Sequence, residues 1–351
     1  MHQLQSRTMG RMTLSLATAL VLAISASVLM PSAASACAGC RNPNLPAARS
    51  DAGPVTPGSV LLQVAAAVSH VRVSHAAGCD EVVGCAVTPI QPAYDHNLTI
   101  VPAQLQATLA VGATEAVAFE LAVPIRLVSS GVNYTTPDGD RYSPLDGGIH
   151  HRNELLVGLG DMTLSSRGTW QFGRWWLTGR LGVRLPTGHT EEDPFALGDR
   201  GVAHQHIQFG TGTFDPLAGI DATYSTSGYE TSLYVQGDVS LYENRHGFRG
   251  PARGLVGFAG GWKVSQVTVL GMSLEGSFEG AERWSGLIRQ DASLGRSEML
   301  LGPSVTWRRG ITTLHAAARF VVLRKIVEGS EDPGTIRAPA TLLIGATWAL
   351  R

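Results

Sequence analysis

The chain has 351 residues, of which 16% are charged and 41 are glycine, and its formal net charge is −1 at pH 7. This balance argues against a nucleic-acid-binding protein, which needs a basic face. Beyond residue 36, no apolar run approaches the ~20 residues that a membrane helix requires.

The first 36 residues have the features of an export signal. Arg7 and Arg11 give a basic start, residues 14–30 are mostly apolar, and residues 34–36, Ala-Ser-Ala, form a small-residue cleavage site. We predict cleavage after residue 36, because the apolar run is short for a membrane anchor. Cys37 follows directly, so lipid attachment stays an alternative, although Ala34 stands where a lipoprotein site prefers leucine.

Four cysteines follow as two close pairs, Cys37 with Cys40 and Cys79 with Cys85. Export places them in an oxidising compartment, so two short disulfides are expected. The Cys-Ala-Gly-Cys spacing of the first pair leaves a metal or redox site open. We assign residues 1–36 to the signal, residues 37–57 to a periplasmic segment with a Cys pair, and residues 58–351 to one large domain.

From residue 59 onward, apolar and polar residues alternate. Within residues 267–280, for example, Leu270, Met272 and Leu274 fall on one face and Glu275 on the other. A period of two predicts strands with one apolar and one polar face. The predicted strands are residues 59–74, 97–112, 115–130, 153–168, 174–186, 214–225, 229–242, 253–264, 266–279, 297–308, 311–326 and 339–351.

Short turns and long loops alternate strictly between these strands. The short turns lie near residues 113, 171, 227, 265 and 310. In bacterial barrels short turns face the periplasm and long loops face outward. The pattern predicts an all-β, transmembrane, antiparallel up-and-down barrel of about 12 strands in the outer membrane, with both termini in the periplasm. Residues 187–213 leave the exact count open, since they can extend the flanking strands.

Aromatic residues gather beside the short turns. Amphipathic rings prefer a membrane interface, so they predict a girdle on the periplasmic side. We predict that Tyr242, Phe248 and Trp284 mark the outer girdle. The periplasmic set is Trp170, Trp175, Trp176, Tyr224, Tyr229, Trp262, Trp307 and Trp348.

Charged residues fall on the strand faces opposite the apolar ones. A charge that faces hydrocarbon costs about 2–4 kcal/mol at the membrane midplane, so these faces are predicted to line a polar lumen. Both signs occur, which leaves open a water-filled, weakly selective pore and an ion-paired plug. The candidates for setting selectivity are Glu120, Arg126, Arg180, Arg184, Asp238, Glu275, His315 and Arg319.

Histidines are frequent in the predicted long loops. His204 and His206 place two imidazoles on one side of an extended segment, a workable half-site for Cu or Zn, and Glu191 lies nearby. Exposed loops are usually rich in polar residues, so the alternative is that these histidines are ordinary surface residues that bind no metal. The candidate metal ligands are His150, His151, His189, His204 and His206.

Motifs for catalysis are missing from the sequence. It contains no Gly-x-Ser-x-Gly elbow, phosphate-binding loop, His-Glu-x-x-His pair or Rossmann glycine pattern. We therefore predict that the protein is not an enzyme and uses no cofactor. Its predicted partners are outer-membrane lipid, a small-molecule solute and the barrel assembly machinery.

Four segments carry residues typical of strand ends and chain reversals. They are 158–164 (Gly-Leu-Gly-Asp-Met-Thr-Leu), 184–188 (Arg-Leu-Pro-Thr-Gly), 208–216 (Gln-Phe-Gly-Thr-Gly-Thr-Phe-Asp-Pro) and, more loosely, 242–249 (Tyr-Glu-Asn-Arg-His-Gly-Phe-Arg). In these segments the chain resembles a group of bacterial outer-membrane barrels described as transporters, or as the outer-membrane component of a meta-cleavage phenol-degradation pathway. The resemblance implies a barrel that passes small solutes, apolar or aromatic ones included.

Three functions are therefore open at this point. The favoured one is passive passage of a small solute through the lumen. The second is a metal-handling envelope protein that uses the loop histidines or the pair Cys37 and Cys40. The third is a closed barrel with a structural or adhesive role.

Overall fold

The computed structural model describes residues 45, 56–77, 94–144, 152–289, 292–328, 336–337 and 340–350. The predicted export signal, all four cysteines, and His150 and His151 lie outside these residues. Four expectations therefore stay predictions: cleavage of the signal, lipid attachment, disulfide formation, and metal binding by His150 and His151.

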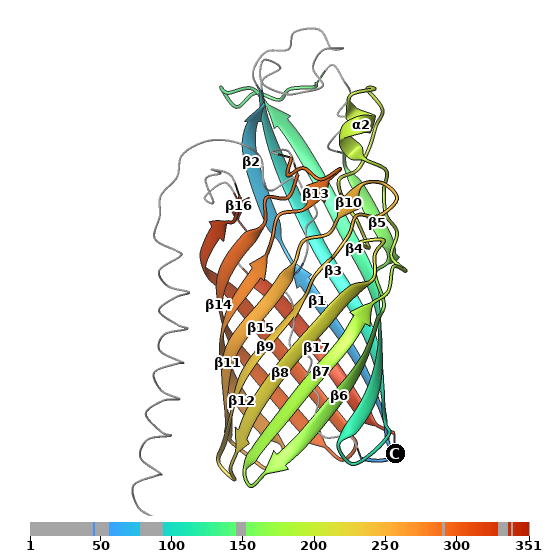
Figure 1. Cartoon of the computed structure of the whole chain (residues 1–351). Helices are drawn as coiled ribbons and strands as arrows, with labels where there is room; N and C mark the ends of the chain where they lie inside the picture. The colour runs from blue at the N-terminus through green and yellow to red at the C-terminus, as the bar shows by residue number, and fades with distance from the viewer. Residues whose placement is uncertain are drawn as a thin grey trace, which may run out of the picture.

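The described chain forms an antiparallel β-sheet that closes on itself (Figure 1). The closure lies at β1 (Val60–Ser69), which pairs with β17 (Ala340–Ala349) on one side and with β3 (Tyr94–Gly112) on the other. The other strands of the wall are β2 (Val71–Ala77), β4 (Val117–Thr135), β5 (Glu154–Leu159), β6 (Thr163–Phe172), β7 (Trp175–Arg184), β8 (Asp215–Ser225), β9 (Tyr229–Asp238), β11 (Arg253–Lys263), β12 (Thr268–Glu279), β14 (Arg296–Arg309) and β15 (Thr312–Ile326).

The prediction of an antiparallel barrel of about 12 strands is confirmed. β2 continues β1, and β5 leads into β6, so each of these pairs is one strand of a 12-strand wall. Residues 187–213 contain the short helix α2 (Pro194–Gly198) and no strand, which settles the count. The short strand β16 (Ile336–Arg337) extends the sheet beside β2, whereas β10 (Phe248–Arg249) and β13 (Arg283–Trp284) form a separate two-stranded sheet.

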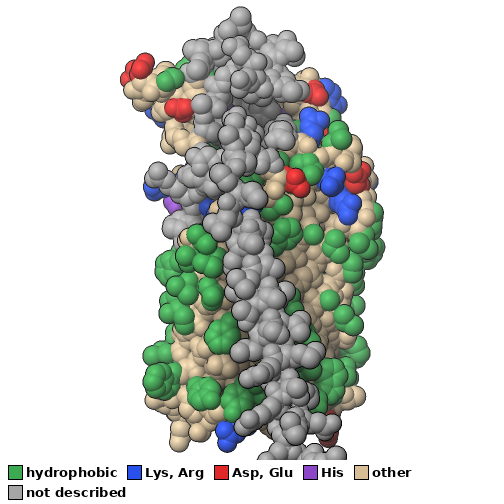
Figure 2. All heavy atoms as spheres, turned by 60° about the vertical axis from the view of Figure 1, so that its left-hand side comes forward, with side chains coloured by type: hydrophobic (Ala, Val, Ile, Leu, Met, Phe, Trp, Pro, Cys, Tyr) green, Lys and Arg blue, Asp and Glu red, His purple; other side chains and the backbone are tan. Residues whose placement is uncertain are grey.

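Side chains alternate between the two faces of the wall as the sequence pattern predicts. Along β12, Leu270, Met272 and Leu274 are exposed on the outside, whereas Glu275 is buried inside. Figure 2 shows hydrophobic side chains over the body of the barrel and most of the visible charged ones toward one end. No helix in the described part of the chain is long and apolar enough to cross a membrane.

The two ends of the barrel differ. At the end where β1 begins and β17 ends, short turns join the strands; we call this the short-turn end (Figure 1). At the other, long-loop end, β2, β3 and β4 rise above the remaining wall. β3 and β4 each have 19 residues, against 10 in β7. We call the opening at the long-loop end the mouth. On one side of it, β2, β3 and β4 form a tall wall (Figure 1).

Aromatic rings lie exposed beside the short turns, and their role at a membrane interface stays a prediction. Trp262 is 73% exposed, and Trp175 packs against Tyr224 with ring centroids 5.1 Å apart. The predicted outer girdle is wrong for two residues, since Phe248 and Trp284 are only 1% and 2% exposed. The pairing of β10 with β13 turns both rings inward, where they pack against each other with centroids 4.8 Å apart.

Candidate functional site

One cluster of buried charges lies inside the wall around Glu120 of β4. The Glu120 carboxylate is 2.8 Å from Arg180 Nη2 and 3.5 Å from Arg167 Nη1, and the Ser165 hydroxyl donates to it over 3.3 Å. Glu120 is 6% exposed and Arg167 2%. These side chains are paired with one another, and water hardly reaches them.

A second cluster surrounds Glu275 of β12. Arg319 Nε lies 2.9 Å from Glu275 Oε2, and the Tyr234 hydroxyl donates to Glu275 Oε1 over 2.6 Å. Tyr234 and Glu275 both pair with Gly257 of β11, the strand between them. A Cβ atom at Gly257 would stand 2.5 Å from Tyr234 Cζ. Glycine at this position therefore lets the tyrosine ring cross the strand and reach the carboxylate.

Replacing Gly257 by alanine is expected to displace Tyr234 and to lower the free energy of unfolding by about 1.5–3 kcal/mol, the contribution of a buried hydrogen bond to a charged group. Urea unfolding of the barrel in lipid vesicles measures the change. Gly260→Ala on the same strand is the matched control, because a Cβ atom at Gly260 has nothing within 4 Å. Equal unfolding free energies for the two variants would contradict this role of Gly257.

Nearer the long-loop end, charges of alternating sign form an arc along the inner wall from β7 to β15. Asp238 lies between two arginines, bonded to Arg184 and 3.3 Å from Arg253. Each charge in the arc has a partner of opposite sign, so the arc carries no large field of one sign. The remaining pairs are Arg184 with Asp215 at 3.8 Å, Arg296 with Glu279 at 3.8 Å and with Glu298 at 4.0 Å, and Arg324 with Glu298 at 2.7 Å.

At the long-loop end, a segment of the chain folds against the inside of the tall wall. We call residues 185–214 the mouth segment. Arg126 Nη1 donates to the Gln208 carbonyl over 2.7 Å, and its guanidinium lies 5.6 Å from the centroid of the Phe209 ring. Arg126 therefore anchors the mouth segment, whereas the sequence predicts a side chain that sets selectivity.

Apolar side chains of the tall wall pack against Ile207 where the mouth segment meets the wall. We call this set of seven the mouth cluster, and each of its members is only 1–9% exposed. Phe209 packs against it. The mouth cluster consists of Val71, Val73, Leu98, Ile100, Val128, Val132 and Ile207.

A buried polar node ties the mouth segment to the wall. Asp161 accepts hydrogen bonds from the backbone N–H groups of Gly188 and Thr211, at 2.9 and 2.7 Å. The Thr211 hydroxyl lies 3.0 Å from Asp161 Oδ2 and 2.9 Å from Asp215 Oδ2, so it bridges the two carboxylates. Asp215 Oδ1 also accepts from Ser240 over 2.8 Å. We call this set the Asp161 node.

Glycine makes the node possible where two backbone segments touch. A Cβ atom at Gly210 would lie 2.4 Å from Asp161 Oδ1 and 2.8 Å from Gly188 Cα. The Asn244 amide donates to the Thr211 carbonyl over 3.0 Å. All four segments that carry the family resemblance therefore meet at the node, although the sequence predicts only separate strand ends and reversals.

Comparison with known proteins shows which solved structures share this fold. No family model and no curated protein matches the chain. Among solved structures, an outer membrane channel from Pseudomonas putida matches with a TM-score of 0.56 and 12% identity, over 86% of this chain and 100% of that one. The chain has the fold of that channel.

Two further solved structures match less well. A Pseudomonas aeruginosa FadL homologue gives a TM-score of 0.39 at 10% identity, over 84% of this chain and 91% of that one. The Pseudomonas putida toluene transporter TodX gives 0.40 at 8% identity, over 83% and 89%. Neither likeness is close enough to carry an argument about this chain.

The predicted lumen residues all lie on the inner face, but they fall into separate groups. Glu120 and Arg180 share one cluster, Glu275 and Arg319 a second, and the arc holds Arg184 and Asp238. His315 Nδ1 lies apart, 3.0 Å from the Thr306 hydroxyl. Their effect on selectivity stays a prediction.

Arg167 is a lumen residue that the sequence pattern missed. Arg126 of β4 faces Gly158, and Glu120 faces Ser165, so six steps along β4 correspond to seven on its partner. The extra residue is a β-bulge, which moves the following side chains to the opposite face. Residues 160–162, Gly-Asp-Met, are the signal that could have indicated it, since glycine in a strand often marks a bulge.

The predicted metal ligands do not converge among the described residues. His204 and His206 are buried with ring centroids 5.2 Å apart, His204 Nδ1 lies 2.8 Å from the Val202 carbonyl, and His206 meets the Phe195 ring edge-on. His189 is exposed beside Glu191. In the described part of the chain, no group of three or more His, Cys, Asp or Glu side chains is placed to hold a metal ion.

Proposed function

We propose that this chain is an outer-membrane channel for small, largely apolar solutes, aromatic ones included. The observation that carries the proposal is the mouth cluster, an apolar patch on the inside of the tall wall that the mouth segment covers. Burying apolar surface away from water is favourable by about 25 cal/mol per Å². An apolar solute that takes the place of the mouth segment on this patch can therefore leave water at the mouth, before it reaches the charged part of the lumen.

The arrangement of charges deeper in the lumen favours the same class of solute. Glu120 and Glu275 are each held by arginine, and the arc alternates in sign. Paired charges attract a free ion weakly, whereas a neutral solute passes them without separating the pairs. The shared fold with an outer membrane channel supports the channel function.

Uptake into liposomes tests the proposal. We expect phenol to enter vesicles that contain the refolded barrel faster than glucose does. Replacing Ile207 of the mouth cluster by asparagine is expected to lower phenol uptake about tenfold and to leave glucose entry unchanged, because burying one such side chain is worth ~1.5–3 kcal/mol. Val202→Asn, at an exposed position of the mouth segment, is the matched control.

Two results would contradict the proposal. Equal uptake rates for phenol and glucose, both in wild type and in Ile207→Asn, would indicate a polar pore in which the mouth cluster plays no part in solute entry. No uptake of either solute by a correctly folded barrel would favour the closed, structural alternative. Heat-modifiable migration on a gel verifies the fold in both cases.

A further inference from the structure

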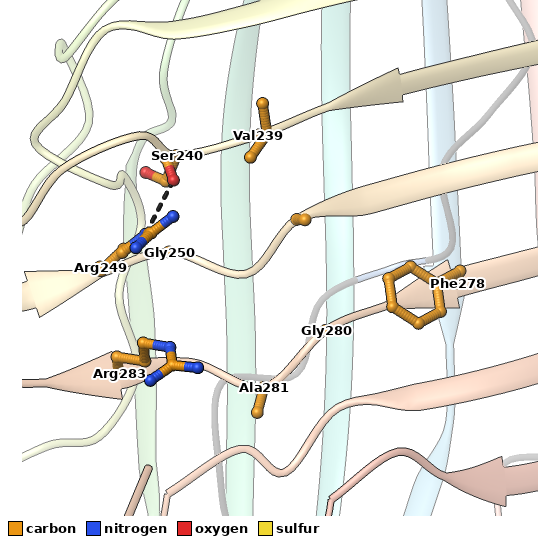
Figure 3. A pocket seen from close by; sticks show the side chains of 9 residues that line it. Val239, Ser240, Arg249, Gly250, Phe278, Gly280, Ala281 and Arg283 are labelled. Atoms are coloured by element: carbon orange, nitrogen blue, oxygen red, sulfur yellow. Dashed lines mark hydrogen bonds between the residues drawn. The ribbon is translucent and has the colours of Figure 1, made fainter. Parts of the chain in front are cut away.

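A small pocket opens on the outside of the wall at the long-loop end, where β9 and β12 give way to loops (Figure 3). Its volume is about 150 Å³. Val239, Phe278 and Ala281 supply an apolar lining, and Arg249 and Arg283 supply two guanidinium groups. Phe278 is 44% exposed and belongs to the outward face of β12, so the pocket continues the apolar surface of the barrel.

The two arginines face each other. In the two-residue ladder of β10 with β13, Phe248 pairs with Trp284 and Arg249 pairs with Arg283. The aromatic pair is buried, so the arginines lie on the opposite, outward side of the ladder. Like charges directly opposite each other on neighbouring strands destabilise a sheet.

Among the described residues, no carboxylate forms a salt bridge with either arginine. Arg249 Nε donates to the Ser240 carbonyl over 2.9 Å, and Arg283 Nη1 donates to the Gly286 carbonyl over 3.4 Å. Neither forms a salt bridge within the described part of the chain, in contrast to the arginines of the lumen. A bound anion between them would relieve the repulsion.

Directly below the pocket, two neighbouring outward positions of the wall carry no side chain. Gly254 of β11 faces outward and pairs with Gly237 on one side and with Phe278 on the other. A Cβ atom at Gly254 would meet only the Gln236 carbonyl, at 3.7 Å. These two glycines leave a shallow strip of bare backbone beside Phe278, bordered on its far side by Val235 and Val256.

We propose that this pocket binds an outer-leaflet lipid with a phosphorylated headgroup. The phosphate lies between Arg249 and Arg283, and an acyl chain follows the glycine strip beside Phe278. Arginine suits phosphate because its planar fork donates two parallel hydrogen bonds. A free phosphate would leave the apolar lining without a function. The inference rests on the proposed placement in the outer membrane with the long loops outside.

Lipid binding by the folded barrel in detergent micelles tests this site. We expect native mass spectrometry to show diphosphorylated lipid A bound to wild type and at least tenfold less of it bound to the double variant Arg249→Gln, Arg283→Gln. Phe278→Ala is expected to weaken binding as well, whereas dephosphorylated lipid A is expected to bind poorly to every variant. Arg309→Gln, an exposed arginine at the short-turn end, is the matched control.

Two outcomes would overturn the proposal. One is retention of lipid A by the folded double variant at the wild-type level. The other is competition by inorganic phosphate at concentrations comparable to those of the lipid, which would indicate an anion site with no preference for a lipid. Because binding is measured in micelles, the result does not depend on whether the barrel passes solutes.

Discussion

Replacing Glu120 by alanine is expected to lower the free energy of unfolding by about 3–5 kcal/mol, the usual cost of removing one partner of a buried ion pair. The Glu120 carboxylate lies between Arg167 and Arg180, and water hardly reaches it. Its removal leaves the two guanidinium groups facing each other in a site of low dielectric. Urea unfolding in lipid vesicles measures the loss, and Glu120→Gln separates the loss of charge from the loss of volume.

The matched control is Glu230→Ala, near the short-turn end. Glu230 pairs with Arg308 at 3.4 Å, and the two side chains are 27% and 49% exposed. Exposed pairs contribute about 0–1 kcal/mol, so this variant is expected to unfold almost as wild type does. A loss as small for Glu120→Ala as for Glu230→Ala would mean that water screens the inner cluster, and that the lumen is wetter there than the burial indicates.

The barrel and the inner faces of its strands could be predicted from the sequence because one strong physical rule fixes them. A wall between lipid and a polar interior needs apolar residues at every second position, and a charge on the wrong face is costly. Leu274 and Glu275 show the result, since the first is exposed on the outside and the second is buried inside. Short turns and long loops then give the order of the strands.

Arg167 shows where that rule fails. An alternation counted from Glu154 through β5 gives the wrong face for every residue of β6, because one inserted residue reverses the pattern. A single sequence gives weak evidence for such a bulge, since Gly-Asp-Met is equally compatible with an unbroken strand or a turn.

The packing of the long loops could not be predicted, because it depends on contacts between distant residues. Thr211 reaches Asp161 across 50 positions of sequence, and Thr213 reaches Ser240 across 27. Such contacts leave no periodic pattern in the sequence around either residue. The same lack of information led to the wrong prediction for Phe248 and Trp284, whose burial follows from one short ladder between two loops.

Replacing Asp161 by alanine is expected to release the mouth segment while the wall stays folded. Asp161 accepts two backbone hydrogen bonds and lies 3.0 Å from the Thr211 hydroxyl, and a hydrogen bond to a charged group contributes about 1.5–3 kcal/mol. Local opening of the segment should become correspondingly more frequent. Trypsin cleavage after the exposed Arg200 reports it, and we expect the rate to rise at least tenfold in the folded barrel.

Glu192→Ala is the matched control for this variant, because Glu192 is an exposed carboxylate of the same mouth segment. Equal cleavage rates for the two variants would show that Asp161 does not hold the segment. Asp161→Asn is the sharper test. One carboxylate oxygen accepts from Gly188 and the other accepts from Thr211, so an amide nitrogen in either position would face an N–H donor. We therefore expect asparagine to open the segment nearly as far as alanine does, since the node requires two acceptors at Asp161.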